Sequence, residues 1–307
     1  MALTKSDIPD LLLPGLKAEF ALAYQEELNN SVTEQIATIV NTTLPIQKYG
    51  WHGAVPPMRE FIDERKPSGL APYALSIEDK VFESTIAVDR KAIEDDQVDL
   101  IRLRVKDLAY RIAQHRHQMT VEALSGGFTA FAYDGLSFFN TAHTLPGGST
   151  YGNRTTDALG ADALATAIST MMTVPDDQNI PLGIVPDTLV VGPKLMWSAL
   201  ELVESPVVVD KSGEFRTDYG NVFKGRLKVV VSPFLQGTSD DYWFLLDTKR
   251  PIRGLILQQR SDVPVEFTAM ESANSDSGFM RDRYHYGVRA RYNVGYGLWQ
   301  AAYGAIL

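Results

Sequence analysis

The sequence predicts an α+β fold in which one very long helix packs against a sheet that contains one very long strand. Apolar residues recur at spacings of 3 and 4 from Val98 to Met119, the pattern of one buried helical face. Strict alternation of apolar residues from Tyr284 to Leu298 is typical of a half-buried strand. Helical and strand patterns mix between residues 156 and 250, which indicates a second lobe.

The composition fits a globular protein of two lobes. The chain has 307 residues, of which 45% are hydrophobic and 22% charged, so it can build a core larger than most single domains hold. It has no cysteine, which excludes disulfides, thiolate nucleophiles and cysteine zinc sites. A net charge of -9 argues against a dedicated nucleic-acid-binding protein, because such proteins are usually basic. We recognise no secretory signal and no bilayer-spanning stretch, and expect a soluble intracellular protein that binds no membrane.

The first 50 residues are expected to form an arm of one or two helices with little core of its own. Leu16, Phe20, Tyr24 and Leu28 repeat every four residues, and apolar residues at 36, 39 and 40 follow. This pattern predicts a helix over residues 15–41. The prolines and glycines of "TLPIQKYGWHGAVPP" then break it.

Residues 58–90 predict a long, charged hairpin. "MREFIDERK" is the expected first limb, "PSGLAP" the turn, and "YALSIEDKVFESTIAVDR" the second limb, whose alternation slips at "EDKV". A two-stranded ribbon is marginal alone in water, so we expect this one to lie on another surface, such as that of a second subunit. The charged residues expected in that contact are Arg59, Glu60, Asp63, Glu64, Arg65, Lys66, Lys80 and Glu83.

The long helix is the clearest element. Asp95 or Asp96 can cap its start and Gly126 or Gly127 its end, which gives roughly 28 residues and about 42 Å. The long strand would span roughly 50 Å, so the two elements can lie alongside each other. The second lobe is expected to contain the buried strand "DTLVVG", the helix "PKLMWSALELVES" and the strands "RLKVVVSPF" and "DYWFLLDT".

One short stretch, "AYDGLSFFNTAH", contains residue types that can form a hydrolase site: Asp134, Ser137, Asn140 and His143. A serine nucleophile often stands on a G-x-S-x-G elbow, and the context here, G-L-S-F-F, lacks the second glycine. We therefore interpret the stretch as a turn held by two buried phenylalanines and by side-chain hydrogen bonds to the backbone. We expect no catalytic residue, no metal site and no cofactor.

Polar residues on the long helix leave two interpretations open. His115 and His117 stand two positions apart and face different directions, which argues against a shared metal ion. A cluster of basic residues forms either a solvated face or a weak, non-specific contact with nucleic acid or an acidic partner. Its members are Arg102, Arg104, Lys106, Arg111 and Arg116.

Five blocks of the sequence resemble the major head subunit (gpT) family of Mu-like phages and prophages. They are "PPMREFIDERK", "FESTIAVDRKAIEDD", "YDGLSFFNTAH", "LVVGPKL" and "YGVRARYNVGYGLWQAAYG", in order along nearly the whole chain. The resemblance implies the tailed-phage major capsid (Johnson) fold. It divides the chain into an N-terminal arm (1–50), an extended β-hairpin loop (51–92), a peripheral domain with a spine helix (93–155), an inserted axial domain (156–254) and return strands of the peripheral domain (255–307).

The resemblance also implies a function without catalysis. The chain would assemble in the host cytoplasm into the icosahedral shell of a virion. Its partners would be copies of itself in pentamers and hexamers, a separate scaffold-protease, a portal, and packaged double-stranded DNA contacted weakly through the basic cluster. An encapsulin-type compartment of the same fold and a soluble hydrolase using Ser137 and His143 remain as alternatives.

Overall fold

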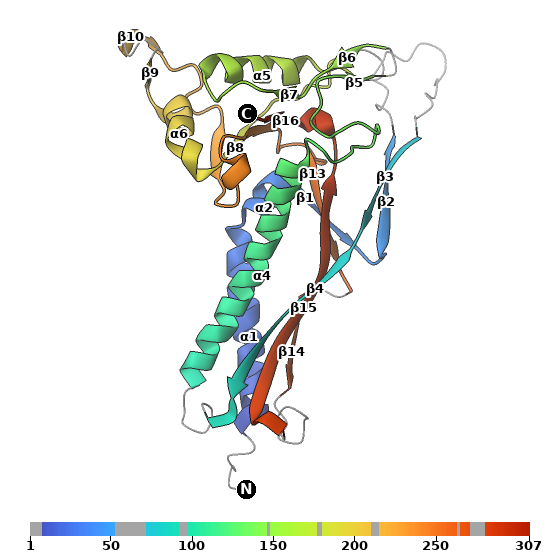
Figure 1. The fold of residues 1–307 in the computed structure, drawn as a ribbon, viewed down its shortest axis with the longest axis vertical. Helices are drawn as coiled ribbons and strands as arrows, with labels where there is room; N and C mark the ends of the chain where they lie inside the picture. Colours follow the sequence, from blue (N-terminus) through green and yellow to red (C-terminus); the bar gives the residue numbers. More distant parts are fainter. Residues whose placement is uncertain are drawn as a thin grey trace, which may run out of the picture.

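The structure is a computed structural model that describes residues 8–52, 72–91, 98–145, 148–176, 180–209, 215–262, 265–270 and 280–307. Figure 1 shows an elongated molecule. Two long helices and several long strands run through its lower part, here called the first lobe. Shorter helices, a second sheet and the C-terminus occupy the upper part, here called the second lobe.

The first lobe consists of helices α1 (Ile8–Asn29) and α4 (Val98–Gly126) beside a five-stranded sheet (Figure 1). The longest strand, β15 (Arg283–Tyr296), pairs antiparallel with three others: β4 (Lys80–Asp89), β13 (Leu255–Arg260) and β14 (Glu266–Met270). β1 (Ala37–Thr42) extends the sheet by parallel pairing with β13. The predicted long helix and long strand are therefore confirmed.

The apolar seam of α4 packs on the alternating face of β15. Ile101, Val105, Leu108 and Ile112 are buried, in one cluster with the residues of β15 at 284, 286 and 288. Leu16 and Phe20 of α1 are buried in this same cluster. The N-terminal helix therefore has no separate core, as expected, and instead contributes to the core that α4 and the sheet build.

The N-terminal helix ends earlier than its apolar pattern suggested. α1 stops at Asn29, Ser31 caps the one-turn helix α2 (Val32–Ile36), and the chain then enters β1. The run "ATIVNT" in β1 is rich in β-branched residues, which favour strands. Pairing with β13 satisfies its backbone groups, and this long-range contact overrides the helical spacing of Ile39 and Val40.

The hairpin also differs from its prediction. The strand that pairs with β3 (Pro72–Glu78) is β2 (Ile46–His52), upstream of the expected first limb. The expected first limb and the turn lie outside the described residues. The slip at "EDKV" is real: β3 ends at Glu78, β4 begins at Lys80, and the chain passes there from the β2–β3 pair into the main sheet.

The second lobe is built on a five-stranded mixed sheet in the order β11 (Lys228–Val231), β8 (Thr188–Val191), β12 (Trp243–Leu246), β16 (Ala302–Ala305) and β7 (Arg154–Thr155). Helices α5 (Ala161–Thr173) and α6 (Met196–Glu204) flank it (Figure 1). Two small pairs complete the described strands: β5 (His143–Thr144) with β6 (Thr150–Tyr151), and β9 (Val207–Val209) with β10 (Phe215–Gly220). The last strand, β16, belongs to this sheet and not to the sheet of β15, where the return strands were expected.

No helix in the described part of the chain is both long enough and apolar enough to cross a bilayer.

Candidate functional site

The polar residues of "AYDGLSFFNTAH" form a partly buried hydrogen-bonded cluster, here called the clamp, and not a catalytic triad. The Ser137 hydroxyl donates to the carbonyl of Phe139 at 3.1 Å and accepts from the amide of Asn140 at 3.0 Å. His143 is fully buried and uses Nδ1 toward Asp134 (2.5 Å) and Nε2 toward Asn153 (3.2 Å). Because both ring nitrogens of His143 are engaged elsewhere, it cannot act as a base for Ser137. The structural interpretation is confirmed, and the hydrolase alternative is excluded.

The clamp begins at a turn that the sequence did indicate. Gly135 has a φ of 79°, which favours glycine, and the Asp134 carboxylate accepts from the backbone N–H of Leu136 at 3.1 Å. Two further residues of the clamp, Asn153 and Trp299, lie farther along the chain, and no sequence motif indicated them. The Asn153 amide donates to the carbonyls of residues 138, 299 and 302, and the ring of Trp299 stacks on His143 with centroids 3.9 Å apart.

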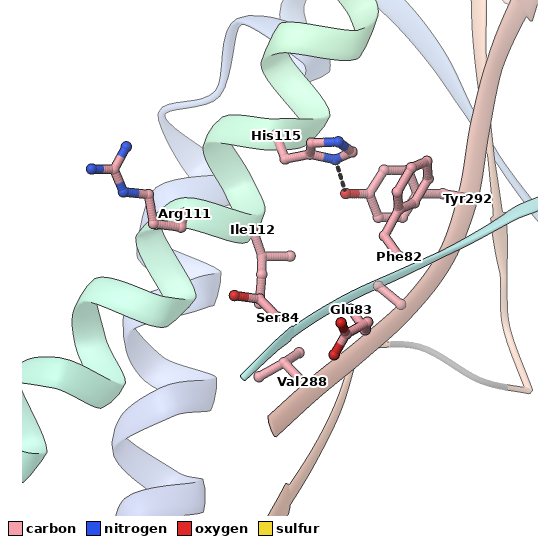
Figure 2. A pocket seen from close by; sticks show the side chains of 9 residues that line it. Phe82, Glu83, Ser84, Arg111, Ile112, His115, Val288 and Tyr292 are labelled. Atoms are coloured by element: carbon pink, nitrogen blue, oxygen red, sulfur yellow. Dashed lines mark hydrogen bonds between the residues drawn. The ribbon is translucent and has the colours of Figure 1, made fainter. Parts of the chain in front are cut away.

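A surface cavity of about 250 Å³ lies between α4 and the strands β4 and β15 (Figure 2). Its apolar lining is Phe82, Ile112, Val288, Ala290 and Tyr292, and its polar lining is Glu83, Ser84, Arg111 and His115. We call it the spine pocket. Figure 2 shows His115 reaching from α4 toward Tyr292, whose hydroxyl lies 2.7 Å from Nδ1 of the histidine. Burial lowers the pKa of His115 and raises that of Tyr292, so both are neutral near pH 7.

Exposed apolar side chains occur on two of the elements that bound the spine pocket, α4 and β4. Leu103 and Tyr110 on the outer side of α4 are 60% and 46% exposed, and Val81 on β4 is 55% exposed. Among the described strands, β4 pairs only with β15, which makes it an outer strand of the sheet. Unpaired outer strands and exposed apolar side chains are features that protein partners commonly cover.

The structure divides the basic cluster of α4 in two. Arg102, Arg104, Lys106 and Arg111 are exposed, and Arg102 pairs with Glu19 at 3.3 Å. Arg116 is only 2% exposed and bonds to Tyr24 (3.1 Å) and Glu34 (3.3 Å). It is therefore not part of the exposed basic surface of α4, where a contact with DNA or scaffold was expected. α1 and α2 cover this turn of α4, which periodicity within α4 could not reveal.

The other residues that the sequence singled out, the charged hairpin residues and His117, lie apart from the clamp and from the basic cluster. Residues 59–66 of the hairpin lie outside the described residues, whereas Lys80 and Glu83 are exposed on β4. His117 lies 2.9 Å from the hydroxyl of Ser232 and meets the ring of Phe234 edge-on, so it joins α4 to the second lobe. In the described segments, no group of three histidine or acidic side chains could hold a metal ion.

Comparison with known proteins identifies the family. The family model described as Mu-like prophage major head subunit gpT matches residues 10–158, 149–235 and 236–306. The chain is 24% identical to the FluMu major head subunit of Haemophilus influenzae over 96% of its own length and 73% of that protein. It is 24% identical to the major capsid protein of Escherichia phage Mu, over 87% of this chain and 64% of that one.

Solved structures show the same fold. The chain resembles a subunit of the procapsid of bacteriophage JBD30 with a TM-score of 0.56 and 26% identity, covering 97% of this chain and 75% of that one. A virus-like particle from Pyrococcus furiosus gives a TM-score of 0.54 at 11% identity, covering 94% and 98%. The likeness to the virus-like particle shows only that the chain has the phage major capsid fold. The match to the gpT family model distinguishes a phage head protein from the shell protein of an encapsulin-type compartment. The chain therefore belongs to the Mu-like prophage major head subunit gpT family: it is a non-enzymatic head protein that forms the icosahedral capsid of a Mu-like virion.

Proposed function

We propose that copies of this head protein assemble as pentamers and hexamers around double-stranded DNA, with the first lobe as the peripheral domain and the second lobe as the axial domain. A separate scaffold-protease and a portal would direct assembly. The family match along nearly the whole chain carries this proposal. The JBD30 structures support it, since one is described as a procapsid and another as a capsid decorated with minor capsid protein trimers. We propose minor capsid proteins as partners of this head protein as well.

Coexpression tests this organisation. The head gene would be expressed with its neighbouring genes, and the purified particles imaged by electron microscopy. Closed shells with five-fold and six-fold capsomers, containing DNA when packaging genes are present, are expected. Shells that enclose a protein cargo in place of DNA would contradict the proposal.

Residues 58–66, the expected first limb of the charged hairpin, are proposed to bind the spine pocket of a neighbouring copy. Their sequence "MREFIDERK" combines apolar side chains, which suit the apolar lining, with both signs of charge. The pocket rim offers both signs as well, in Arg111 and Glu83. Apolar anchors in a pocket with charge pairs at the rim are typical of protein interfaces.

A large side chain placed in the spine pocket should block assembly without preventing folding, so the two effects can be measured separately. Ser84 lines the pocket, whereas its neighbour Thr85 is exposed on the other side of β4. We expect Ser84→Trp to leave a folded subunit that assembles poorly, and the control Thr85→Trp to assemble like the wild type. Light scattering and electron microscopy report assembly, and circular dichroism reports folding. Equal assembly of the two variants would contradict the docking proposal.

Deleting the segment that is proposed to enter the pocket tests the same intersubunit contact from its other side. His52 pairs with Pro72, so residues 53–71 can be replaced by a two-residue Asn-Gly turn that joins β2 to β3. We expect a folded subunit that does not form shells. Loss of folding would show that the hairpin belongs to the core of its own subunit.

The exposed basic residues of α4 are proposed to contact packaged DNA weakly, without reading its sequence. Arg104, Lys106 and Arg111 are exposed on this helix. Replacing Arg104 and Lys106 by glutamine should weaken binding of short duplex DNA by the subunit. It should also reduce the salt dependence by about one unit of log–log slope per lost phosphate contact. An unchanged slope would remove these residues from the DNA contact.

A further inference from the structure

A second, smaller cavity carries a concentration of positive charge unusual for an acidic protein. It has a volume of about 90 Å³ and lies among α1, α4, β13 and β15. Three arginines line it: Arg116 from α4, Arg260 from β13 and Arg291 from β15. The rings of Tyr24 and Tyr292 lie in the same wall. We call it the arginine pocket.

The three guanidinium groups are largely removed from solvent. Arg116 is 2% exposed and Arg260 is 9% exposed, whereas the Arg291 side chain is 22% exposed. Charged side chains are seldom buried unless they are paired. Each has a carboxylate partner: Glu34 for Arg116, Asp262 for Arg260, and Asp79 for Arg291 at 2.7 Å. None of these carboxylates lines the arginine pocket, so its described wall is cationic.

One donor on this wall remains without an acceptor. Nε of Arg116 is buried and has no hydrogen-bond partner, and Arg116 lines the pocket. Nε of Arg291, by contrast, lies 2.7 Å from the carboxylate of Asp79 and forms an ion pair with it. A buried donor without an acceptor is unfavourable, more so on a charged group. The arrangement calls for an occupant that brings lone pairs and negative charge.

We infer that the arginine pocket binds a small oxyanion of the phosphate class. Guanidinium groups present flat forks of N–H donors that match phosphate oxygens. The volume admits one such anion and excludes a nucleotide. Because Glu34, Asp79 and Asp262 neutralise part of the positive charge behind the wall, we expect the anion to bind weakly. The anion would join the N-terminal helix to the sheet, since its ligands come from both.

Thermal unfolding of the unassembled subunit in increasing inorganic phosphate, with ionic strength held constant by chloride, tests the inference. Ligand that binds only the folded state raises the unfolding temperature with concentration, and the dependence yields an affinity. Phosphate also stabilises proteins without binding a site, so the comparison between variants decides. Arg291→Gln removes a charged ligand at the most accessible of the three arginines. Arg226→Gln, at an exposed position of the second lobe, is the matched control.

We expect the wild type and Arg226→Gln to show the same saturable phosphate effect, and Arg291→Gln to bind about tenfold more weakly or worse. A parallel titration with a short DNA duplex distinguishes free phosphate from backbone phosphate. Protection by duplex alone, lost in Arg291→Gln, would assign a phosphodiester to the pocket. An equal response of all three proteins to both probes would overturn the inference. Arg116→Gln is a second test if it folds, and Arg291→Gln suffices if it does not.

Discussion

Nδ1 of His143 lies 2.5 Å from the carboxylate of Asp134, which is 14% exposed, and the fully buried His143 stacks on Trp299 of the C-terminal segment. The other ring nitrogen faces Asn153, whose amide binds the carbonyls of Trp299 and Ala302. One polar cluster therefore fastens the stretch after α4 to the segment that leads into β16. This explains how a motif with the residue types of a hydrolase serves the fold of a shell protein.

Removing the charge of Asp134 should destabilise the subunit. Asp134→Asn replaces an ionic acceptor of a fully buried imidazole, and we expect the free energy of unfolding to fall by about 2–4 kcal/mol. Ser137→Ala, which removes a neutral hydrogen bond in the same turn, should cost about 1 kcal/mol. Denaturant unfolding of unassembled subunits measures both. Equal losses of unfolding free energy in the two variants would mean that the Asp134–His143 pair contributes no more to stability than a neutral hydrogen bond.

The seam of α4 should be far more sensitive than its outer face. Leu108 is 3% exposed, in the cluster with α1 and β15, whereas Arg104 is exposed. Leu108→Ala should lower the free energy of unfolding by about 2–5 kcal/mol through lost burial and a cavity. Arg104→Ala should lower it by about 0–1 kcal/mol. Similar unfolding curves for the two variants would show that the helix packs through a different face.

The buried Arg116 should couple α2 to α4. Its guanidinium contacts Glu34, which is 35% exposed, so we expect an interaction energy of about 1–2 kcal/mol for this pair. A double-mutant cycle with Arg116→Met and Glu34→Gln measures it in unfolding experiments. The pair Arg102–Glu19, whose arginine side chain is 46% exposed, is the matched control and should give less. A coupling energy near zero at Arg116 would leave Tyr24 as its significant partner.

Stability should fall in mild acid because of His117. Burial lowers the pKa of this residue to about 4, so the unfolded chain takes up a proton near pH 6.5 while the folded chain does not. The contribution is complete above pH 6.5 and is lost as the pH falls toward 4. Allowing for partial solvent contact, we expect a loss of about 1–2 kcal/mol.

Comparison with a variant isolates this histidine from the carboxylates that titrate in the same range. Unfolding of the wild type and of His117→Gln would be measured at pH 7.0 and pH 4.5. The wild type should lose more stability between the two pH values than His117→Gln does. The same pH dependence in both would show that His117 is not responsible.

Sequence periodicity located the elements whose burial follows from their own pattern. The seam from Ile101 to Ile112 and the alternation from Tyr284 to Tyr292 both emerged on the expected faces, because one buried side imposes a period of 3.6 or 2 on a helix or strand. The absent nucleophile elbow around Ser137 likewise argued correctly against catalysis. Such features depend on residues close together in the chain.

The tertiary structure alone decided the choices that depend on distant partners. β13 draws residues 37–42 into a strand, although Ile39 and Val40 continue a helical spacing. α1 and α2 bury Arg116, which stands among basic residues that are exposed. β12 and β7 take up the last strand, β16, away from the sheet that β15 shares. In each case one contact across the fold removes a segment from water, and the free energy of that burial exceeds the weak preference of the local sequence.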